Sequence, residues 1–584
     1  MRRTKKKASI LQKIDMLTNK QVLWIIAGLA LVVFFVGLTS PFQGDDNYQI
    51  VNNIPVHSIG NAGTLLSSST FYNGQQLTGP SYRPMMTLTF ALIYTAFKAS
   101  PVAFHIVQLG LYIAAAFLLY LVFKRFFKPW QALFCAVVFL LHPLNSQVAY
   151  AIPSTQDALF VAFGLLGLWI LITYKSVKGI MGFAACLFVS LLSKEIGILF
   201  VVLALLYLIY FDRKRIKIFL AVLIVPVAAY SALRIYAVGL IPVRTHIAPI
   251  DRLGFLQRLY NLPSVLLFYI TKSVMPWKLS TRYFWAYPSF SARNTLLPLA
   301  VDLIVAGAMI YAGVWMYKNR DKKDFHIYVL FSVWTVSGLL PYLQLYPIDM
   351  TASPSWFFLS MAGLLGMVAA VLRAVRAKIN EKVILVGALI IIVTLGVSTA
   401  VQGTYYQTPD KLARHDLSAS KEDYAAMGDI SQSLIREGKY DEALSYARRS
   451  VAIYPTLFNY QNLGVALQQT ADYPAAINAY NHALEHGSQS TTYENLGLIA
   501  LYYGSPADND KTFQTALRAY PQNFKLWLYL AMYEDHEGHN DNAKTAITMA
   551  MKYGQVPKQI STAILNNQPF ALQLPNSDAP FVVK

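Results

Sequence analysis

The amino-acid sequence predicts an all-α protein, in which a polytopic membrane domain is followed by an extracytoplasmic solenoid of helical repeats. Two observations support this prediction. Of 584 residues, 55% are hydrophobic and only 14% are charged, which is typical of polytopic membrane proteins. After residue 403 the chain becomes polar and similar to itself at a regular interval, which indicates a repeat fold.

Apolar runs long enough to cross a bilayer recur through the first 400 residues. Segments 85–98 and 261–276 are ambiguous, because each could span, re-enter or lie on the surface. The first run follows the basic start MRRTKKK and has no good cleavage site, so it is expected to remain as a span. We expect about eleven spans, near 22–39, 101–123, 130–146, 157–174, 179–193, 196–211, 216–237, 295–316, 325–343, 355–373 and 382–401.

The distribution of charge predicts the topology. With a cytoplasmic amino terminus, the cytoplasmic segments carry 24 Lys and Arg against five Asp and Glu, which accounts for the whole net charge of +19. Membrane topology therefore explains the basic composition, and no nucleic acid partner is expected. An odd number of spans places the last third outside the cytoplasm. The chain has no N-x-S/T sequon and its last third has no Cys, which fits a bacterial cell membrane.

The polar last third carries a repeat with a period near 34 residues. The stretch YQNLGVAL (460–467) corresponds to YENLGLIA (493–500), and residues 519–550 form a looser copy. These stretches resemble tetratricopeptide repeats, whose concave face typically holds a peptide; a structural spacer is the alternative. The expected domains are 1–403 for the membrane part (40–100 being its first external loop), 404–420 for a linker, 421–556 for the repeats and 557–584 for an extended tail.

Ionisable residues gather at the predicted external ends of the spans, where charged groups are costly unless they are paired or functional. Adjacent like charges at Asp45 and Asp46, in SPFQGDDNYQIV, need a partner or a function. Each of the others also has a structural alternative: a local salt bridge, a helix cap or an anchor to lipid headgroups. The candidates for binding the donor phosphate or the substrate are Arg83, His142, Asp157, Lys194, Glu195 and Arg282.

The combination of outward-facing carboxylates and basic residues suits one kind of chemistry. A carboxylate can act as general base on a hydroxyl nucleophile, and basic groups can hold a departing phosphate. Sugar transfer from a polyprenyl-phosphate carrier fits both, and it inverts the anomeric centre if the phosphate leaves from the opposite face. The sequence shows no Ser nucleophile motif, no Gly-rich phosphate loop and no Cys/His metal cluster.

Several motifs resemble those of a known family. GDDNYQI (44–50) resembles the acidic motif in the first external loop of the GT-C glycosyltransferase superfamily. Four further stretches occur in the order expected for one branch, the transmembrane and tetratricopeptide repeat-containing proteins, which are O-mannosyltransferases. They are SYRPMMTLTFALIY (81–94), FHIVQLGLYI (104–113), LHPLNSQVAYAIPSTQDALF (141–160) and SKEIGIL (193–199). A further stretch, ITKSVMPWKLSTRY (270–283), resembles the middle of that family's membrane domain.

The resemblance implies a GT-C membrane domain, a polyprenyl-phosphate sugar as donor and Ser or Thr of a protein as acceptor. It implies that Asp45 is the catalytic base and that Asp46 supports it. Two positions depart from the family pattern: Asp157 follows STQ with no basic residue before it, and Ser355 precedes Trp356 where an Arg or His is expected. Arg282, Arg83 or Lys194 would then contact the phosphate.

Other readings stay open at the level of sequence. The enzyme could transfer sugar to a lipid or a cell-wall glycan, or the chain could be a non-catalytic scaffold that assembles envelope proteins. Transport is disfavoured because few ionisable residues lie near mid-span. The expected partners are the membrane, the lipid donor and a protein acceptor docked on the repeats. No metal site and no certain cofactor are predicted, and a divalent cation is left open.

Overall fold

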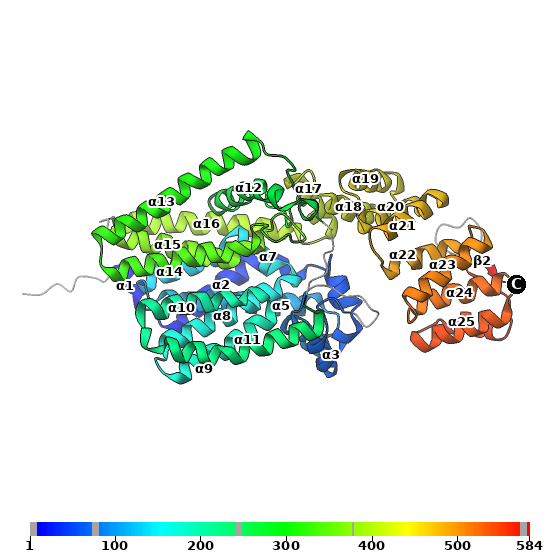
Figure 1. Ribbon diagram of the computed structural model, residues 1–584, viewed down its shortest axis with the longest axis horizontal. Helices are drawn as coiled ribbons and strands as arrows, with labels where there is room; N and C mark the ends of the chain where they lie inside the picture. Colours follow the sequence, from blue (N-terminus) through cyan, green and yellow to red (C-terminus); the bar gives the residue numbers. More distant parts are fainter. Residues whose placement is uncertain (1–8, 73–80, 241–247, 376–378, 573–580, 584) are drawn as a thin grey trace, which may run out of the picture. The chain divides into compact units, whose positions relative to one another are not determined.

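The computed structural model describes residues 9–72, 81–240, 248–375, 379–572 and 581–583. Within them the chain is helical apart from one short β-hairpin, and it divides into two compact units that meet in sequence at Ser420 and Lys421. The first unit contains the apolar helices (Figure 1). Its early helices are α1 (Ile10–Asp15), α2 (Asn19–Phe34), α3 (Ala62–Ser67), α4 (Pro84–Phe97), α5 (Pro101–Phe123), α6 (Pro129–Leu141), α7 (Pro143–Tyr150) and α8 (Thr155–Thr173).

The remaining helices of the first unit alternate between long apolar helices and shorter ones. They are α9 (Val177–Ser193), α10 (Leu199–Phe211), α11 (Ile216–Val238), α12 (Phe255–Val274), α13 (Leu297–Asn319), α14 (Lys322–Leu339), α15 (Phe358–Val375), α16 (Glu381–Tyr405) and α17 (Pro409–Ala419). Short 3₁₀ or π-helical turns extend several of them, so that the span that begins with α2 continues to Thr39.

The eleven expected spans correspond to helices of three kinds. Eight are long and apolar enough to cross a membrane. One, formed by α6 and α7, is bent by 64° at His142 and Pro143, because a proline donates no backbone N–H to the preceding turn. The last two, Val177–Ser193 and Glu195–Phe211, are shorter apolar helices. The expectation of about eleven spans is therefore corrected to eight candidate spans in the described chain, or nine if the bent pair counts as one.

The two ambiguous segments also form helices. Segment 85–98 is α4, a shorter apolar helix in which Phe90 and Ala91 are fully buried. Segment 261–276 lies largely in α12, which is not among the candidate spans of the described chain. In α12 the buried Arg258 donates to the carbonyl oxygens of Leu253 and Gln344. Helix α12 is thereby bonded to the loop that follows α14.

Glycines allow close helix contacts in the first unit, which ends at Ser420 and is called the membrane unit below. A Cβ added at Gly363 of α15 would lie 2.4 Å from the backbone nitrogen of Thr335 in α14. One added at Gly366 would lie 2.1 Å from the Phe331 ring. Small residues at such crossings let membrane helices approach closely and gain van der Waals contact, so these glycines hold α14 against α15.

The second unit consists of successive helical hairpins. Within the repeat, Gly464 leaves room for the Tyr480 ring, since a Cβ there would lie 2.5 Å from it, and Ala443 and Ala476 are fully buried where helices cross. This arrangement is consistent with the tetratricopeptide pattern. The helices are α18 (Tyr424–Arg436), α19 (Tyr440–Ile453), α20 (Leu457–Gln469), α21 (Tyr473–Glu485), α22 (Ser490–Ala500), α23 (Pro506–Ala519), α24 (Phe524–His536) and α25 (Asn540–Tyr553).

Two expected irregular segments are in fact structured. The expected linker 404–420 contains the last residues of α16 and all of α17, which packs on the membrane unit. The expected extended tail contains helix α26 (Lys558–Leu565) and the antiparallel strands β1 (Phe570–Leu572) and β2 (Phe581–Val583). Helix α26 and Phe570 belong to the apolar core of the last hairpin, and this burial explains why the segment is not extended.

Candidate active site

The acidic loop follows the first span and holds its two carboxylates in different surroundings. Asp45 is exposed, whereas Asp46 is 3% exposed. One Asp46 oxygen accepts a hydrogen bond of 2.9 Å from the backbone N–H of Gln43, and the other has no partner among the described residues. Burial raises the pKa of Asp46 to about 7; the Gln43 bond opposes this, and the charge of Asp45 adds to it.

A cluster of charged residues gathers four of the predicted site residues. Arg83, which precedes α4, donates to both carboxylate oxygens of Glu195, at 3.0 and 3.3 Å. Lys194 donates to Asp157 at 2.6 Å, and both side chains are buried. The Lys194 ammonium also lies 5.7 Å from the centre of the Tyr342 ring. Residues from the segment before α4, from α8 and from the α9–α10 junction therefore meet in one place.

Asp349 adds a third acidic group to this cluster. Asp349 lies at the surface, and partial loss of hydration there raises the pKa of its carboxyl group, while the charge of the Arg83 guanidinium lowers it in part. The cluster thus contains three carboxylates and two cations. Each of the two cations is already paired with a carboxylate. An incoming phosphate would have to compete with Glu195 and Asp157 for these cations.

His142 and Arg282 lie outside that cluster. His142 occupies the bend between α6 and α7, where its Nδ1 accepts from the backbone N–H of Leu144. Its proton is therefore assigned to Nε2, which donates to the Ser273 carbonyl at 3.1 Å. These bonds make His142 a helix cap that also joins the bend to α12. Arg282 lies in the loop after α12, where its backbone carbonyl accepts from the Ser280 hydroxyl.

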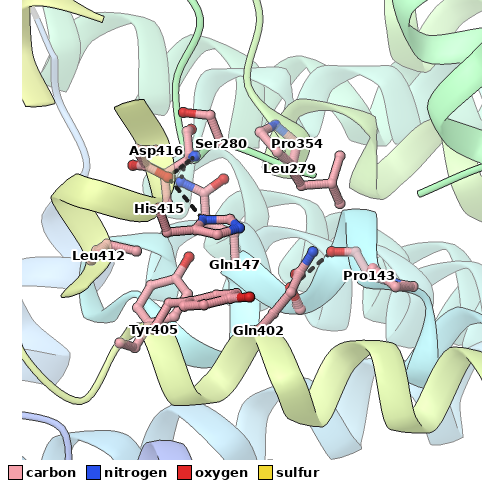
Figure 2. A pocket seen from close by; sticks show the side chains of 13 residues that line it. Pro143, Gln147, Leu279, Ser280, Pro354, Gln402, Tyr405, Leu412, His415 and Asp416 are labelled. Atoms are coloured by element: carbon pink, nitrogen blue, oxygen red, sulfur yellow. Dashed lines mark hydrogen bonds and ion pairs between the residues drawn. The ribbon is translucent and has the colours of Figure 1, made fainter. Parts of the chain in front are cut away.

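A small polar pocket forms the other notable feature of the membrane unit (Figure 2). It lies among α7, the loop 279–281, Pro354, the end of α16 and α17. Asp416 of α17 is 1% exposed and accepts from both the backbone N–H and the hydroxyl of Thr281. The His415 ring stacks on Tyr405 with centroids 3.8 Å apart. These contacts dock α17 on the membrane unit.

The acidic loop reaches this pocket through Gln43. The backbone N–H of Gln43 binds Asp46, and its side-chain amide donates to the carbonyl oxygen of Tyr406 at 3.3 Å. Tyr406 lines the pocket. One residue therefore connects the predicted catalytic carboxylates to the pocket, although the two are separated by more than 350 residues in the sequence.

Sequence reasoning missed the residues that build this pocket. His415 and Asp416 fall in the segment expected to be a linker, and Gln147 was not singled out. Gln147 donates to the Thr281 carbonyl and accepts from the Ser353 hydroxyl. The spacing of LARHDLSA offered a signal, since its buried residues Ala413 and Asp416 are three apart and share one helix face.

The acidic loop is the only place in the described chain where metal ligands were expected, and it holds two carboxylates. In the described part of the chain, no three His, Cys, Asp or Glu side chains come together as a metal-binding group. The acidic loop offers two carboxylates, and that of Asp46 is buried and turned to the Gln43 backbone. Mg²⁺ can be held by one or two carboxylates together with waters and substrate phosphates, so the acidic loop is compatible with the divalent cation that the sequence left open.

Comparison with curated proteins identifies similar sequences. Protein O-mannosyl-transferase F38B6.6 of Caenorhabditis elegans is 26% identical over 190 residues, which are 31% of this chain and 27% of that protein. The chain is similar to protein O-mannosyl-transferases. Human protein O-mannosyl-transferase TMTC3 is 22% identical over 28% of this chain and 18% of its own length. Human protein O-mannosyl-transferase TMTC4 is 27% identical over 24% of this chain and 22% of its own length.

The predicted resemblance to these O-mannosyl-transferases is thereby confirmed. The matches span about a quarter of the relatives' length or less, and no protein family model matches this chain. Among solved structures, ArnT from Cupriavidus metallidurans bound to undecaprenyl phosphate is 15% identical over 82% of this chain and 81% of its own, with a TM-score of 0.36. The Archaeoglobus fulgidus oligosaccharyltransferase, tethered with an acceptor peptide, is 14% identical. That match covers 73% of this chain and 58% of the other, with a TM-score of 0.41.

Proposed function

We propose that this chain is an integral membrane glycosyltransferase. In this proposal it moves a hexose, such as mannose, from a polyprenyl-phosphate carrier to Ser or Thr of an extracytoplasmic protein. The observation that carries the proposal is the acidic loop, where an exposed and a buried aspartate stand side by side after the first span. Similarity to protein O-mannosyl-transferases supports the same activity.

The two aspartates take different roles in this proposal. Asp45 is exposed, so it can reach the acceptor hydroxyl and take its proton as the oxygen attacks the anomeric carbon. The bond from that carbon to the phosphate oxygen breaks on the opposite face, and the sugar configuration inverts. Asp46 is buried and bonded to Gln43, so it orients the loop that carries Asp45.

The departing phosphate requires a cationic contact. Arg83 and Lys194 would supply it if phosphate displaces one of their carboxylate partners, Glu195 or Asp157. The Arg83 pair is the more open to such exchange, because Glu195 is 48% exposed and Asp157 only 4%. Arg282, in the loop after α12, is the further candidate for the phosphate.

The proposed donor and acceptor approach from different sides. The lipid carrier reaches the site from the bilayer, and the protein acceptor comes from the extracytoplasmic compartment, where the repeats offer a docking surface. No resident cofactor is included in this proposal. A bacterial cell membrane is the proposed location, with the amino terminus in the cytoplasm.

A transfer assay tests the proposal. The full chain, reconstituted in liposomes, receives a radiolabelled polyprenyl-phosphate hexose and an extract of envelope proteins, with wild type beside Asp45→Asn. We expect label transfer to protein by wild type and a loss of at least about 100-fold in the variant. Equal transfer by both would remove Asp45 from catalysis. Label found in lipid or glycan would show that the acceptor is not a protein. No transfer with any hexose donor would favour a non-catalytic scaffold.

A further inference from the structure

The pocket beside α17 is chemically distinct from the charged cluster. None of its 13 lining residues is Lys or Arg, and its acidic residue, Asp416, is already bonded to Thr281. The lining instead combines amides, hydroxyl groups, the His415 ring and two tyrosine rings. Phosphate recognition normally uses Arg, Lys or several backbone N–H groups, so the pocket suits a neutral polar group.

The pocket is also small. Its free space is about 290 Å3 including the open mouth, and the enclosed part has room for at most about one water molecule. A hexose ring cannot enter the enclosed part, but the hydroxyl group of a serine or threonine can, while the carbon atoms of that side chain stay in the open mouth. Size and polarity together point to a hydroxyl-bearing side chain.

Two side chains offer hydrogen-bonding groups to such a ligand. Gln402 accepts from the Ser146 hydroxyl through its Oε1, while its –NH₂ group makes no bond within the described chain. The Nδ1 of His415 lies 3.6 Å from an Asp416 oxygen, and its ring is held flat on Tyr405. Its other nitrogen, Nε2, has no hydrogen bond to any described residue. The donor and the ring nitrogen both belong to residues that line the pocket (Figure 2).

We propose that this pocket is an acceptor subsite that binds a Ser or Thr side chain of the polypeptide to be modified, through Gln402 and His415. That the ligand is a polypeptide rests on the proposed function. The position agrees with it, because Gln43 joins the pocket to the loop that carries Asp45. The Ser or Thr in the subsite serves to recognise the acceptor segment. The hydroxyl group that reacts belongs to the residue of that segment that reaches Asp45.

The test measures binding without donor, so it does not depend on transfer. The full chain in nanodiscs is mixed with N-acetyl-serine methylamide or its alanine counterpart, and saturation-transfer difference NMR reports binding of each. One hydrogen bond gained by the hydroxyl predicts about fivefold tighter binding of the serine probe. Equal saturation of the two probes, after subtraction of empty nanodiscs, would overturn the proposal.

Matched variants locate the binding. His415→Phe keeps an aromatic ring on Tyr405 and removes both nitrogens, and Gln402→Glu keeps the oxygen that Ser146 contacts and removes the –NH₂ group. Each is expected to abolish the preference for serine. His326→Phe is the control, because His326 stacks on Tyr210 in the same way, with centroids 4.2 Å apart. A serine preference that survives both pocket variants, or is lost equally in the control, would refute the assignment.

The outcome separates this proposal from the proposed function. Serine-selective binding that depends on Gln402 and His415, in a chain that transfers no sugar, would keep the subsite and reject the enzyme. Sugar transfer to protein by a chain without serine-selective binding would keep the enzyme and reject the subsite.

Discussion

At the scale of single residues, the two neighbouring aspartates differ because one is buried. Burial raises the pKa of Asp46 from 3.8 to about 7, whereas Asp45 remains exposed. Like charges on adjacent residues repel least when one of them is protonated. The structure thus explains how the chain tolerates the pair: near neutral pH the buried member is protonated part of the time.

The Asp46 carboxyl group should make the stability of the membrane unit depend on pH. Its folded pKa is higher than the unfolded value, so the folded state binds the proton more tightly, and stability falls as pH rises from about 4 to about 7. The loss is at most about 4 kcal/mol. We expect the Tm of wild type to drop over this window more than that of Asp46→Asn, measured by tryptophan fluorescence in detergent. Parallel curves for the two proteins would contradict this.

The buried Lys194–Asp157 pair should be sensitive to loss of one partner. Both side chains are at most 5% exposed, so Lys194→Met leaves an unpaired buried carboxylate and should cost about 3–5 kcal/mol. Titration of the purified protein with a denaturing detergent measures this cost. The double variant Lys194→Met/Asp157→Asn should lose less than the two single variants added together.

The second ion pair of the cluster provides the control for that measurement. Arg83 and Glu195 are 18% and 48% exposed, so solvent screens this pair more than the buried one, and its loss should cost about 1 kcal/mol. Arg83→Met should therefore change stability little while Lys194→Met changes it strongly. Equal losses in the two variants would show that burial does not set the strength of these pairs.

At the scale of elements, helix junctions shape the candidate site. The span predicted at 130–146 breaks at His142 and Pro143, and the two expected spans on either side of Lys194 are short. These junctions place His142 and Lys194 at helix ends, where side chains can reach other segments. Hydropathy identifies apolar runs but says little about how a run is divided, because the division depends on caps and neighbours.

Close packing of α14 and α15 gives a testable prediction at this scale. Gly363→Ala would place a methyl group 2.4 Å from the Thr335 backbone, so the helices must separate at a cost of about 1–3 kcal/mol. We expect a lower Tm for this variant. Gly387→Ala in α16 is the matched control, since its Cβ would meet no heavy atom within 4 Å. The same Tm for Gly363→Ala and Gly387→Ala would show that α14 and α15 adjust to the added methyl group without cost.

At the scale of the whole molecule, the charge asymmetry of the sequence predicts the membrane orientation. The predicted cytoplasmic segments hold the entire net charge of +19, and the positive-inside rule then places the second unit outside. Topology therefore stays a prediction.

Cysteine labelling in intact cells tests this orientation. The native Cys135 and Cys186 are buried, so a new cysteine should dominate the signal. Glu537→Cys, exposed in the second unit, should react with a membrane-impermeant maleimide from outside, and Lys214→Cys, in a predicted cytoplasmic loop, should react only after the membrane is opened. The reverse pattern would invert the topology.

The sequence by itself determined the apolar runs, the repeat period and the positions of the charged residues, because hydropathy, periodicity and residue type are local properties. Only the tertiary structure decided which residues meet. Arg83 and Glu195 are 112 residues apart, and Thr281 and Asp416 are 135 apart. A segment that looked like a linker contains α17, whose buried Asp416 accepts from the backbone N–H and the hydroxyl of Thr281. Such pairings depend on how distant helices pack, and no local pattern records them.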